Sequence, residues 1–173
     1  MNDDAQDAGR RNDDSSGAIP RYRATIEPSW IDYNGHLRDA FYGLIVSYAI
    51  DDVMDHLGLD AAYRARTACT LYTLELHLHY LHEVKSTDEL DVETSVLDAD
   101  HKRIHAGCRF TCPRVDGAVA TADVMLMHVH QGEKVTSAAF PDEVDRALQS
   151  LKLSPGAAAA WGPTSRKIEI KRR

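Results

Sequence analysis

The sequence predicts an α+β domain in which an antiparallel five-stranded sheet wraps around one long helix. Apolar residues recur at steps of three and four between Phe41 and Leu57, which is the spacing of one helix face. After this segment, four successive stretches alternate apolar and polar residues, the pattern of half-buried strands. Short polar links join several of these stretches, so we expect antiparallel hairpins that pack as one layer against the helix.

The elements follow one another in a simple order. Residues 22–26 are expected to form a short strand that ends at Pro28, and a polar turn then runs to His36. The long helix comes next, because Asp39 near its start favours the positive end of a helix and Gly58 is a natural stop. The remaining elements, four strands and a second, shorter helix, are expected within residues 74–81, 90–97, 104–110, 123–127 and 141–151.

The chain of 173 residues fits a single domain with two tails. Residues 1–18 are almost free of apolar side chains and cannot offset their ordering entropy, so we expect a disordered N-terminal tail. Residues 19–152 are the expected domain. Residues 153–173 contain prolines, glycines and an alanine run, and we expect an irregular C-terminal extension there.

Composition excludes several classes of partner. The net charge of −7 argues against nucleic acid, because phosphate backbones are bound by basic surfaces. No apolar run approaches the length of a membrane span, and no signal sequence precedes the domain, so we expect a cytoplasmic protein that does not enter the membrane. Cys69, Cys108 and Cys112 are too few for a disulfide framework and are expected to be free, largely buried thiols.

The turn before the long helix is the first candidate site. Asp32, Asn34 and His36 place a carboxylate, an amide and an imidazole within five residues at a helix entrance. Backbone N–H groups at a helix N-terminus can polarise a carbonyl and hold a developing oxyanion. A carboxylate beside them can act as general base on water or attack an acyl carbon itself. The alternative is a plain helix cap, since Asp and Asn are preferred capping residues.

The second candidate is Glu75 with His77 and His79, which project from one face of the expected strand. His128 and His130 on a later strand add two more imidazoles. This donor set makes a metal-dependent hydrolase one alternative function. A polar sheet face, or an interface between subunits, is the favoured explanation of the pattern, and we expect no metal.

The third candidate is the cluster of Lys102, Arg103 and His105 at an expected hairpin. Such a cluster, with Lys85 and Arg109, suits a phosphate-bearing ligand. The alternative is a solvated hairpin tip.

The segment from Trp30 to His36, with the Ala40-Phe41-Tyr42 helix start, closely resembles the signature of 4-hydroxybenzoyl-CoA-thioesterase-like hot-dog proteins. Matching motifs continue downstream at residues 57–59, 75–77, 80–81, 102–105, 126–129 and 140–141, and more loosely at residues 162–163 and 166–168. The resemblance covers roughly residues 20–170. Within that group, the sequence is most similar to betainyl-CoA thioesterases of bacterial carnitine breakdown, which release glycine betaine and CoA.

This resemblance implies a hot-dog fold and an enzyme that hydrolyses a short polar acyl-CoA without a cofactor. It implies that Asp32 is the catalytic carboxylate and that Asn34 and His36 orient the water and the thioester. It implies CoA binding by the cluster of Lys102, Arg103 and His105. The site of such proteins lies between two subunits, so a homodimer is implied, often paired into a dimer of dimers.

A betaine substrate makes one further demand. Its quaternary ammonium has no N–H to donate and is best held by aromatic faces. Candidates for substrate binding are Trp30, Tyr33, Tyr42, Tyr48 and Tyr72, together with the carboxylate of Glu75. Ordinary core packing is the alternative for the aromatics.

One residue departs from the family pattern. Relatives usually carry Asn where this chain has Arg38, which brings bulk and positive charge. This departure puts the acyl group in question more than the fold. It also keeps a second function class open, a non-catalytic acyl-CoA-binding or small-ligand-binding protein.

Overall fold

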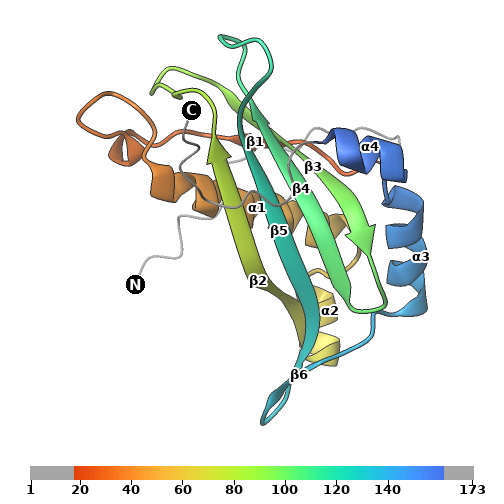
Figure 1. Ribbon diagram of the computed structural model, residues 1–173. Coiled ribbons are helices and arrows are strands. Elements are labelled where there is room, and N and C mark those ends of the chain that lie inside the picture. Colours follow the sequence, from red (N-terminus) through yellow and green to blue (C-terminus); the bar gives the residue numbers. More distant parts are fainter. Residues whose placement is uncertain (1–17, 162–173) are drawn as a thin grey trace, which may run out of the picture.

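The structure, a computed structural model, describes residues 18–161 (Figure 1). Its helices are α1 (Asp39–His56), α2 (Ala61–Thr67), α3 (Asp142–Leu151) and α4 (Pro155–Ala160), and η1 (Pro28–Trp30) is a single 3-10 turn. Its strands are β1 (Tyr22–Ala24), β2 (Cys69–Tyr80), β3 (Leu90–Ala99), β4 (Arg103–Thr111), β5 (Ala118–Gln131) and β6 (Val135–Ser137).

The sheet is antiparallel and has the strand order β1-β3-β4-β5-β2. The short strand β6 extends the sheet by pairing with the end of β5, and it was not predicted. The predicted α+β class is confirmed, because five strands curve around the one long helix α1 (Figure 1). None of the helices within residues 18–161 is long and apolar enough to cross a membrane.

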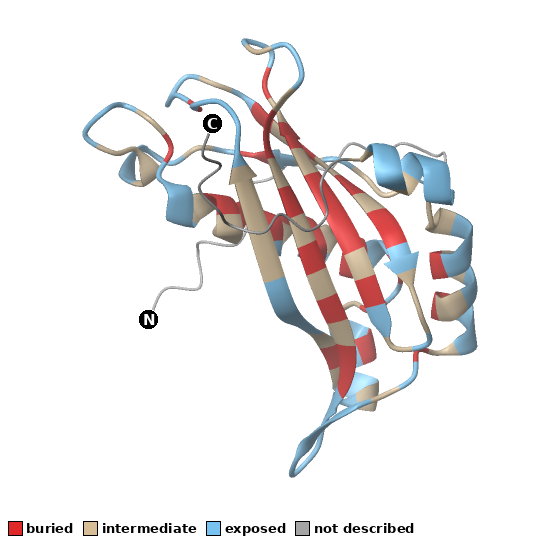
Figure 2. Cartoon of the chain, in the orientation of Figure 1, coloured by how far each residue is buried: buried red, intermediate tan, exposed pale blue. Residues whose placement is uncertain are grey.

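The core forms between α1 and the concave face of the sheet. The helix buries seven residues along one stripe, from Tyr42 to Met54. Alternate residues of the central strands face them, among them Phe110, whose ring centroid is 5.5 Å from that of Tyr42. Strand β5 alternates buried and half-buried positions along most of its length (Figure 2). Burial of each large side chain contributes roughly 1.5–3 kcal/mol, so this layer pair holds the helix start in a defined place.

The strands extend beyond their predicted limits. Strand β5 has 14 residues and begins at Ala118, before the predicted start at Asp123, because its first part consists of small residues with a weak alternation signal. Helix α2 was not predicted either. The side chain of Asp60 caps it by accepting a hydrogen bond from the backbone N–H of Tyr63 at 2.8 Å, and Tyr63 is its one buried residue.

Residues 155–160 of the C-terminal extension form helix α4, where we expected irregular chain. Ser154 caps α4 through the backbone N–H of Ala157, Pro155 occupies its first turn, and alanines complete it. The indole of Trp161, which follows, lies so close over Gly107 of β4 that a side chain at this glycine would collide with it. Arg109 covers the same indole, with its Cζ 4.3 Å from the ring centroid. Residues 1–17 and 162–173, where most of the expected disordered tail and the end of the extension fall, lie outside the described residues.

The three cysteines are free thiols, as expected. Cys108 and Cys112 are both buried on the core side of the sheet and Cys69 is half-buried. Burial raises the pKa of the Cys108 thiol to about 11, so this thiol stays protonated at neutral pH.

Candidate active site

The segment Asp32–His36 forms a tight turn that the Asp32 carboxylate holds closed. Its Oδ1 accepts hydrogen bonds from the backbone N–H of Asn34 at 2.8 Å and of His36 at 3.0 Å. The Asn34 amide donates to the other carboxylate oxygen at 3.5 Å. Gly35 has φ +80°, a left-handed conformation that glycine adopts at low cost. The sequence therefore folds this segment around the residue expected to be catalytic.

These hydrogen bonds set the charge of Asp32. The pKa of Asp32 lies below its ordinary value of 3.8. The main cause is the hydrogen bond from the backbone N–H of His36, and the hydrogen bonds from Asn34 add to it. The carboxylate is therefore ionised at neutral pH. It does not cap α1, because that helix begins at Asp39 with Arg38 as its N-cap and without a side-chain cap bond. The helix-cap alternative for Asp32 is thus wrong, and the carboxylate instead caps its own turn.

Backbone contacts fix the turn against the rest of the domain. The backbone N–H of Leu37 donates to the carbonyl of Val84 at 2.7 Å, and His36 forms a bridge with Lys85, so the turn is tied to the loop between β2 and β3. The indole of Trp30 stacks on the ring of Phe41 in α1, with centroids 5.0 Å apart and planes 12° apart. This stacking gives Trp30 a packing role at the helix start.

A cavity of about 340 Å³ lies beside this turn. It is lined by residues from the turn, from the start of α1 and from the end of β2 and the loop that follows: His36, Asp39, Tyr42, Tyr80, His82 and Glu83, with two leucines. Of the residues predicted for the site, His36 and Tyr42 line it. Asp39, Tyr80, His82 and Glu83 were missed, because the chain gives no local signal that the end of a strand 41 residues downstream returns to the helix start.

The other aromatic candidates lie elsewhere. Tyr33 projects from the turn and is 94% exposed. Tyr72 lies on β2, where its hydroxyl accepts a hydrogen bond from the Gln131 amide at 3.0 Å. Tyr48 packs 6.1 Å from the ring of Tyr22, well along α1 from the turn. A single chain thus brings only Tyr42 of these candidates to the cavity.

Glu75 and its two histidines lie on β2. Leu76 faces Gly43 of α1, so Glu75 and His77 face the opposite side of the sheet, with Glu75 Oε1 2.7 Å from His77 Nε2. Within residues 18–161, no three His, Cys, Asp or Glu side chains are grouped so that they could hold a metal ion. The geometry therefore gives no support to the metal-dependent alternative.

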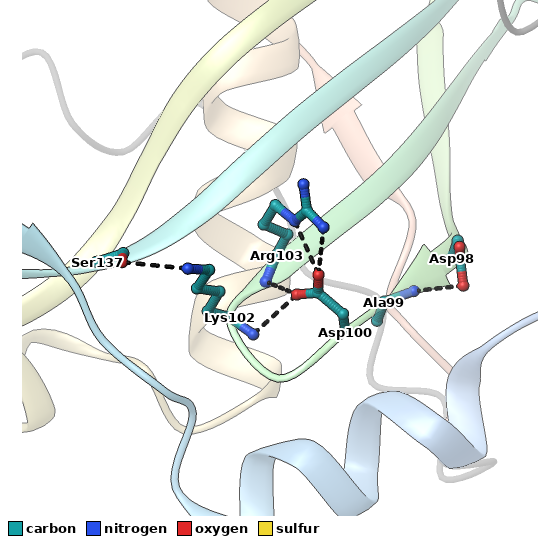
Figure 3. A network of polar contacts seen from close by, with 6 residues as sticks. All are labelled: Asp98, Ala99, Asp100, Lys102, Arg103 and Ser137. Carbon is teal, nitrogen blue, oxygen red and sulfur yellow. Dashed lines mark hydrogen bonds and ion pairs between the residues drawn. The ribbon is translucent and has the colours of Figure 1, made fainter.

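The basic cluster lies at the hairpin between β3 and β4 (Figure 3). The guanidinium of Arg103 holds Asp100 through two bonds of 2.8 and 2.6 Å, which lowers the pKa of Asp100 to about 2. Lys102 donates to the Ser137 hydroxyl at 3.4 Å, and His105 Nε2 lies 3.1 Å from Asp123 Oδ1. A bound phosphate would compete with Asp100 for Arg103, whereas the ammonium of Lys102 meets, among residues 18–161, only the neutral Ser137 hydroxyl.

The hairpin and the turn lie at opposite ends of the sheet (Figure 1). Tyr80 pairs with Ala120 of β5, and Arg103 pairs with Met127 of the same strand. The two positions are seven residues apart on β5, or roughly 23 Å at about 3.3 Å per residue. One chain therefore does not bring the basic cluster to the Asp32 turn.

The model of the thioesterase-like superfamily matches residues 26–148. The betainyl-CoA thioesterase of Pseudomonas aeruginosa is 42% identical over 136 residues, 79% of this chain and 85% of that protein. The L-carnitine dehydrogenase/betainyl-CoA thioesterase of Agrobacterium fabrum is 38% identical over 131 residues, which are 75% of this chain but only 26% of that longer protein. A Staphylococcus aureus protein solved in complex with CoA superposes with a TM-score of 0.77 at 29% identity, covering 87% of this chain and 94% of that chain.

These similarities confirm the family and the fold that the sequence motifs implied. The matched residues 26–148 include the Asp32 turn, α1 and every strand of the sheet except β1. The chain therefore belongs to the thioesterase-like superfamily of hot-dog proteins.

Proposed function

We propose that this protein is an acyl-CoA thioesterase that hydrolyses betainyl-CoA to glycine betaine and CoA. The observation that carries the proposal is the 42% identity to the Pseudomonas aeruginosa betainyl-CoA thioesterase, which extends over 85% of that enzyme. The Agrobacterium relative, whose name joins L-carnitine dehydrogenase to betainyl-CoA thioesterase, agrees with a role in carnitine degradation. We place the reaction in the cytoplasm, where acyl-CoA substrates are formed.

In the proposed mechanism, Asp32 supplies the catalytic carboxylate. Hydrolysis adds the oxygen of water to the acyl carbon, the C–S bond breaks, and the leaving CoA thiolate takes up a proton. Asp32 either accepts the proton of the attacking water or attacks the acyl carbon first, and its lowered pKa keeps it ionised for both roles. We assign to Asn34 and His36 the orientation of the water and the thioester.

We further propose that the enzyme works as a homodimer with two active sites, each formed by residues of both subunits. Strand β2 is an edge strand of 12 residues, and it exposes Tyr72, Leu74 and Tyr80. A long edge with exposed apolar side chains favours pairing with another chain. A second copy would also resolve the separation of roughly 23 Å within one chain, because Lys102, Arg103 and His105 of one subunit could bind the CoA whose acyl group lies at the other subunit's Asp32.

Thiol release from a panel of CoA thioesters tests the proposed activity. The panel contains betainyl-CoA, acetyl-CoA and 4-hydroxybenzoyl-CoA, and free CoA is measured with a thiol reagent. We expect betainyl-CoA to give the highest kcat/KM. Lack of turnover of every thioester by protein with an intact circular dichroism spectrum would overturn the enzyme assignment.

One observation favours a second candidate, a non-catalytic acyl-CoA-binding protein. Oδ1 of Asp32 is occupied by two backbone N–H groups, so only the other oxygen is free of backbone partners. Calorimetric titration separates the two functions. Binding of intact betainyl-CoA, recovered unhydrolysed after the titration, would support the binding protein.

A further inference from the structure

The cavity beside the Asp32 turn has a lining suited to a positively charged acyl group. We propose that it is the site for the trimethylammonium group of the substrate, held by the ring of Tyr80, which packs against Tyr42, and by the carboxylates of Asp39 and Glu83. This inference rests on the proposed function and specifies how its substrate is selected. The volume of about 340 Å³ is at the small end of ligand pockets, which fits a short acyl group rather than a long chain.

The aromatic part of the site is preassembled. The rings of Tyr42 and Tyr80 meet edge to face, with centroids 5.1 Å apart and planes 81° apart. Tyr42 is fixed in the core, while Tyr80 remains 51% exposed, so part of its ring is open to a ligand. The Tyr80 hydroxyl donates to the backbone carbonyl of Asp39 at 3.2 Å, which ties the end of β2 to the start of α1. Burial raises the pKa of Tyr42 to about 12, so this phenol stays neutral.

The charges around the cavity favour a cation. The residues that line it include two carboxylates, Asp39 and Glu83, and neither a lysine nor an arginine. The pKa of Glu83 lies below its ordinary value, so Glu83 is anionic. The main cause is a hydrogen bond from the backbone N–H of Glu83 to its carboxylate, and nearby positive groups lower the pKa further. Arg114, one of those groups, pairs its guanidinium with Asp88 through bonds of 2.9 to 3.2 Å and also donates to the backbone carbonyl of Glu83 at 2.6 Å. For the CoA phosphates, in contrast, this lining offers neither a lysine nor an arginine.

The position of the cavity suits the proposed chemistry. His36 belongs both to the cavity lining and to the turn that Asp32 closes. In betainyl-CoA a single methylene joins the ammonium to the thioester carbonyl, so a cation in the cavity keeps the carbonyl next to this turn. Arg38, the residue that departs from the family pattern, is exposed and does not line the cavity. Its charge therefore does not oppose a cationic acyl group there.

A pair of isosteric substrates isolates the contribution of the charge. Betainyl-CoA and 3,3-dimethylbutyryl-CoA have the same shape, but the second carries a carbon in place of the quaternary nitrogen. We expect the wild-type enzyme to prefer betainyl-CoA by at least tenfold in kcat/KM, since cation–π contacts and two carboxylates act only on the cation. The ratio of the two values is the readout, because any loss that a variant causes in both reactions cancels.

Three variants and two controls assign the preference to residues. Asp39→Asn and Glu83→Gln each remove one charge, and Tyr80→Leu removes a ring; we expect each to lower the ratio roughly three- to tenfold, mainly through KM for betainyl-CoA. Tyr80→Phe keeps the ring and should retain the ratio. Asp116→Asn, which removes an equal charge from the exposed loop between β4 and β5, should leave the ratio unchanged.

The outcomes separate this inference from the proposed function. Equal hydrolysis of both thioesters by the wild type, or a ratio that survives Asp39→Asn, Glu83→Gln and Tyr80→Leu, would overturn the ammonium site while leaving the thioesterase intact. Hydrolysis of neither thioester by folded protein would instead remove the thioesterase activity and the ammonium site together.

Discussion

The Oδ1 atom of Asp32 accepts a hydrogen bond from the backbone N–H of His36 at 3.0 Å. The proposed catalytic carboxylate and the histidine proposed to orient the thioester therefore belong to one closed turn. The turn is held from outside by the loop between β2 and β3, through Leu37 and Val84. A carboxylate fixed in this way is preorganised, so it needs little rearrangement when charge develops on the substrate.

Replacement of Asp32 by Asn tests the proposed catalytic role. Asn keeps the size and an oxygen acceptor for the turn but removes the charge, so we expect kcat to fall roughly 10²- to 10⁴-fold. Steady-state thiol release measures the loss, and circular dichroism verifies the fold. Asp116→Asn is the matched control and should retain activity. An unchanged rate in Asp32→Asn would shift the catalytic role to Glu75 or His36.

The pH dependence of the reaction follows from the lowered pKa of Asp32. A group whose pKa is depressed in the folded protein stays ionised until the pH falls through that lower value. We therefore expect the loss of kcat/KM caused by Asp32 protonation to occur below pH 3.8, the ordinary value for Asp. The lowered pKa of Asp32 also stabilises the folded state at pH values above the ordinary pKa of Asp. This stabilisation is lost as the pH falls through the lowered pKa of the folded protein. A loss centred well above pH 3.8 and abolished in Asp32→Asn would contradict this assignment.

Gly35→Ala probes the conformation of the turn. Gly35 has φ +80°, and an added Cβ would meet no atom within 4 Å, so the cost is conformational rather than steric. We expect a loss of about 1–2 kcal/mol in the free energy of unfolding, measured by urea denaturation, together with reduced activity. Gly156→Ala is a suitable control, because Gly156 is equally open, lacks positive φ and lies in α4. Equal stability of the two variants would show that the turn tolerates another conformation.

Tyr63→Phe probes a buried polar contact between α2 and β5. The hydroxyl of Tyr63 lies 2.9 Å from Nε2 of His128, and Nδ1 of His128 lies 3.0 Å from the carbonyl of Ala138. Because Nδ1–H donates to that carbonyl, Nε2 accepts from the hydroxyl. His128 is only 1% exposed, so loss of the hydroxyl leaves Nε2 without this partner. We expect unfolding to become easier by about 1–3 kcal/mol, against less than about 0.5 kcal/mol for the exposed control Tyr33→Phe.

Lys102→Gln tests the proposed CoA-binding cluster. Lys102 donates only to the Ser137 hydroxyl among its described contacts, so its charge is available to a phosphate. We expect roughly a tenfold rise in KM for betainyl-CoA, equivalent to about 1.4 kcal/mol, with kcat almost unchanged. The rise should shrink at high ionic strength. Lys134→Gln, on the exposed turn between β5 and β6, is the control, and an equal effect in both variants would argue for general charge attraction only.

The sequence by itself determined the layer pair and the turn before its long helix. A period of three to four residues from Phe41 to Leu57 and the alternation in the later strands are local properties, because each side chain's face depends only on its neighbours along the chain. The turn was equally legible, since an Asp, an Asn and a Gly within four residues favour the conformation observed. Helix α2 and helix α4 escaped prediction because both are short and owe their positions to packing and single capping bonds.

Only the tertiary structure decided what surrounds the turn. The cavity exists because the antiparallel pairing of β2 with β5 returns Tyr80 to the start of α1, where its hydroxyl meets Asp39 across 41 residues of chain. The same pairing places Lys102 and Arg103 at the far end of the sheet, although the sequence motifs had grouped them with Asp32. Local patterns specify which face of an element a side chain occupies. The distance between residues on different elements depends instead on register and strand order, which are non-local.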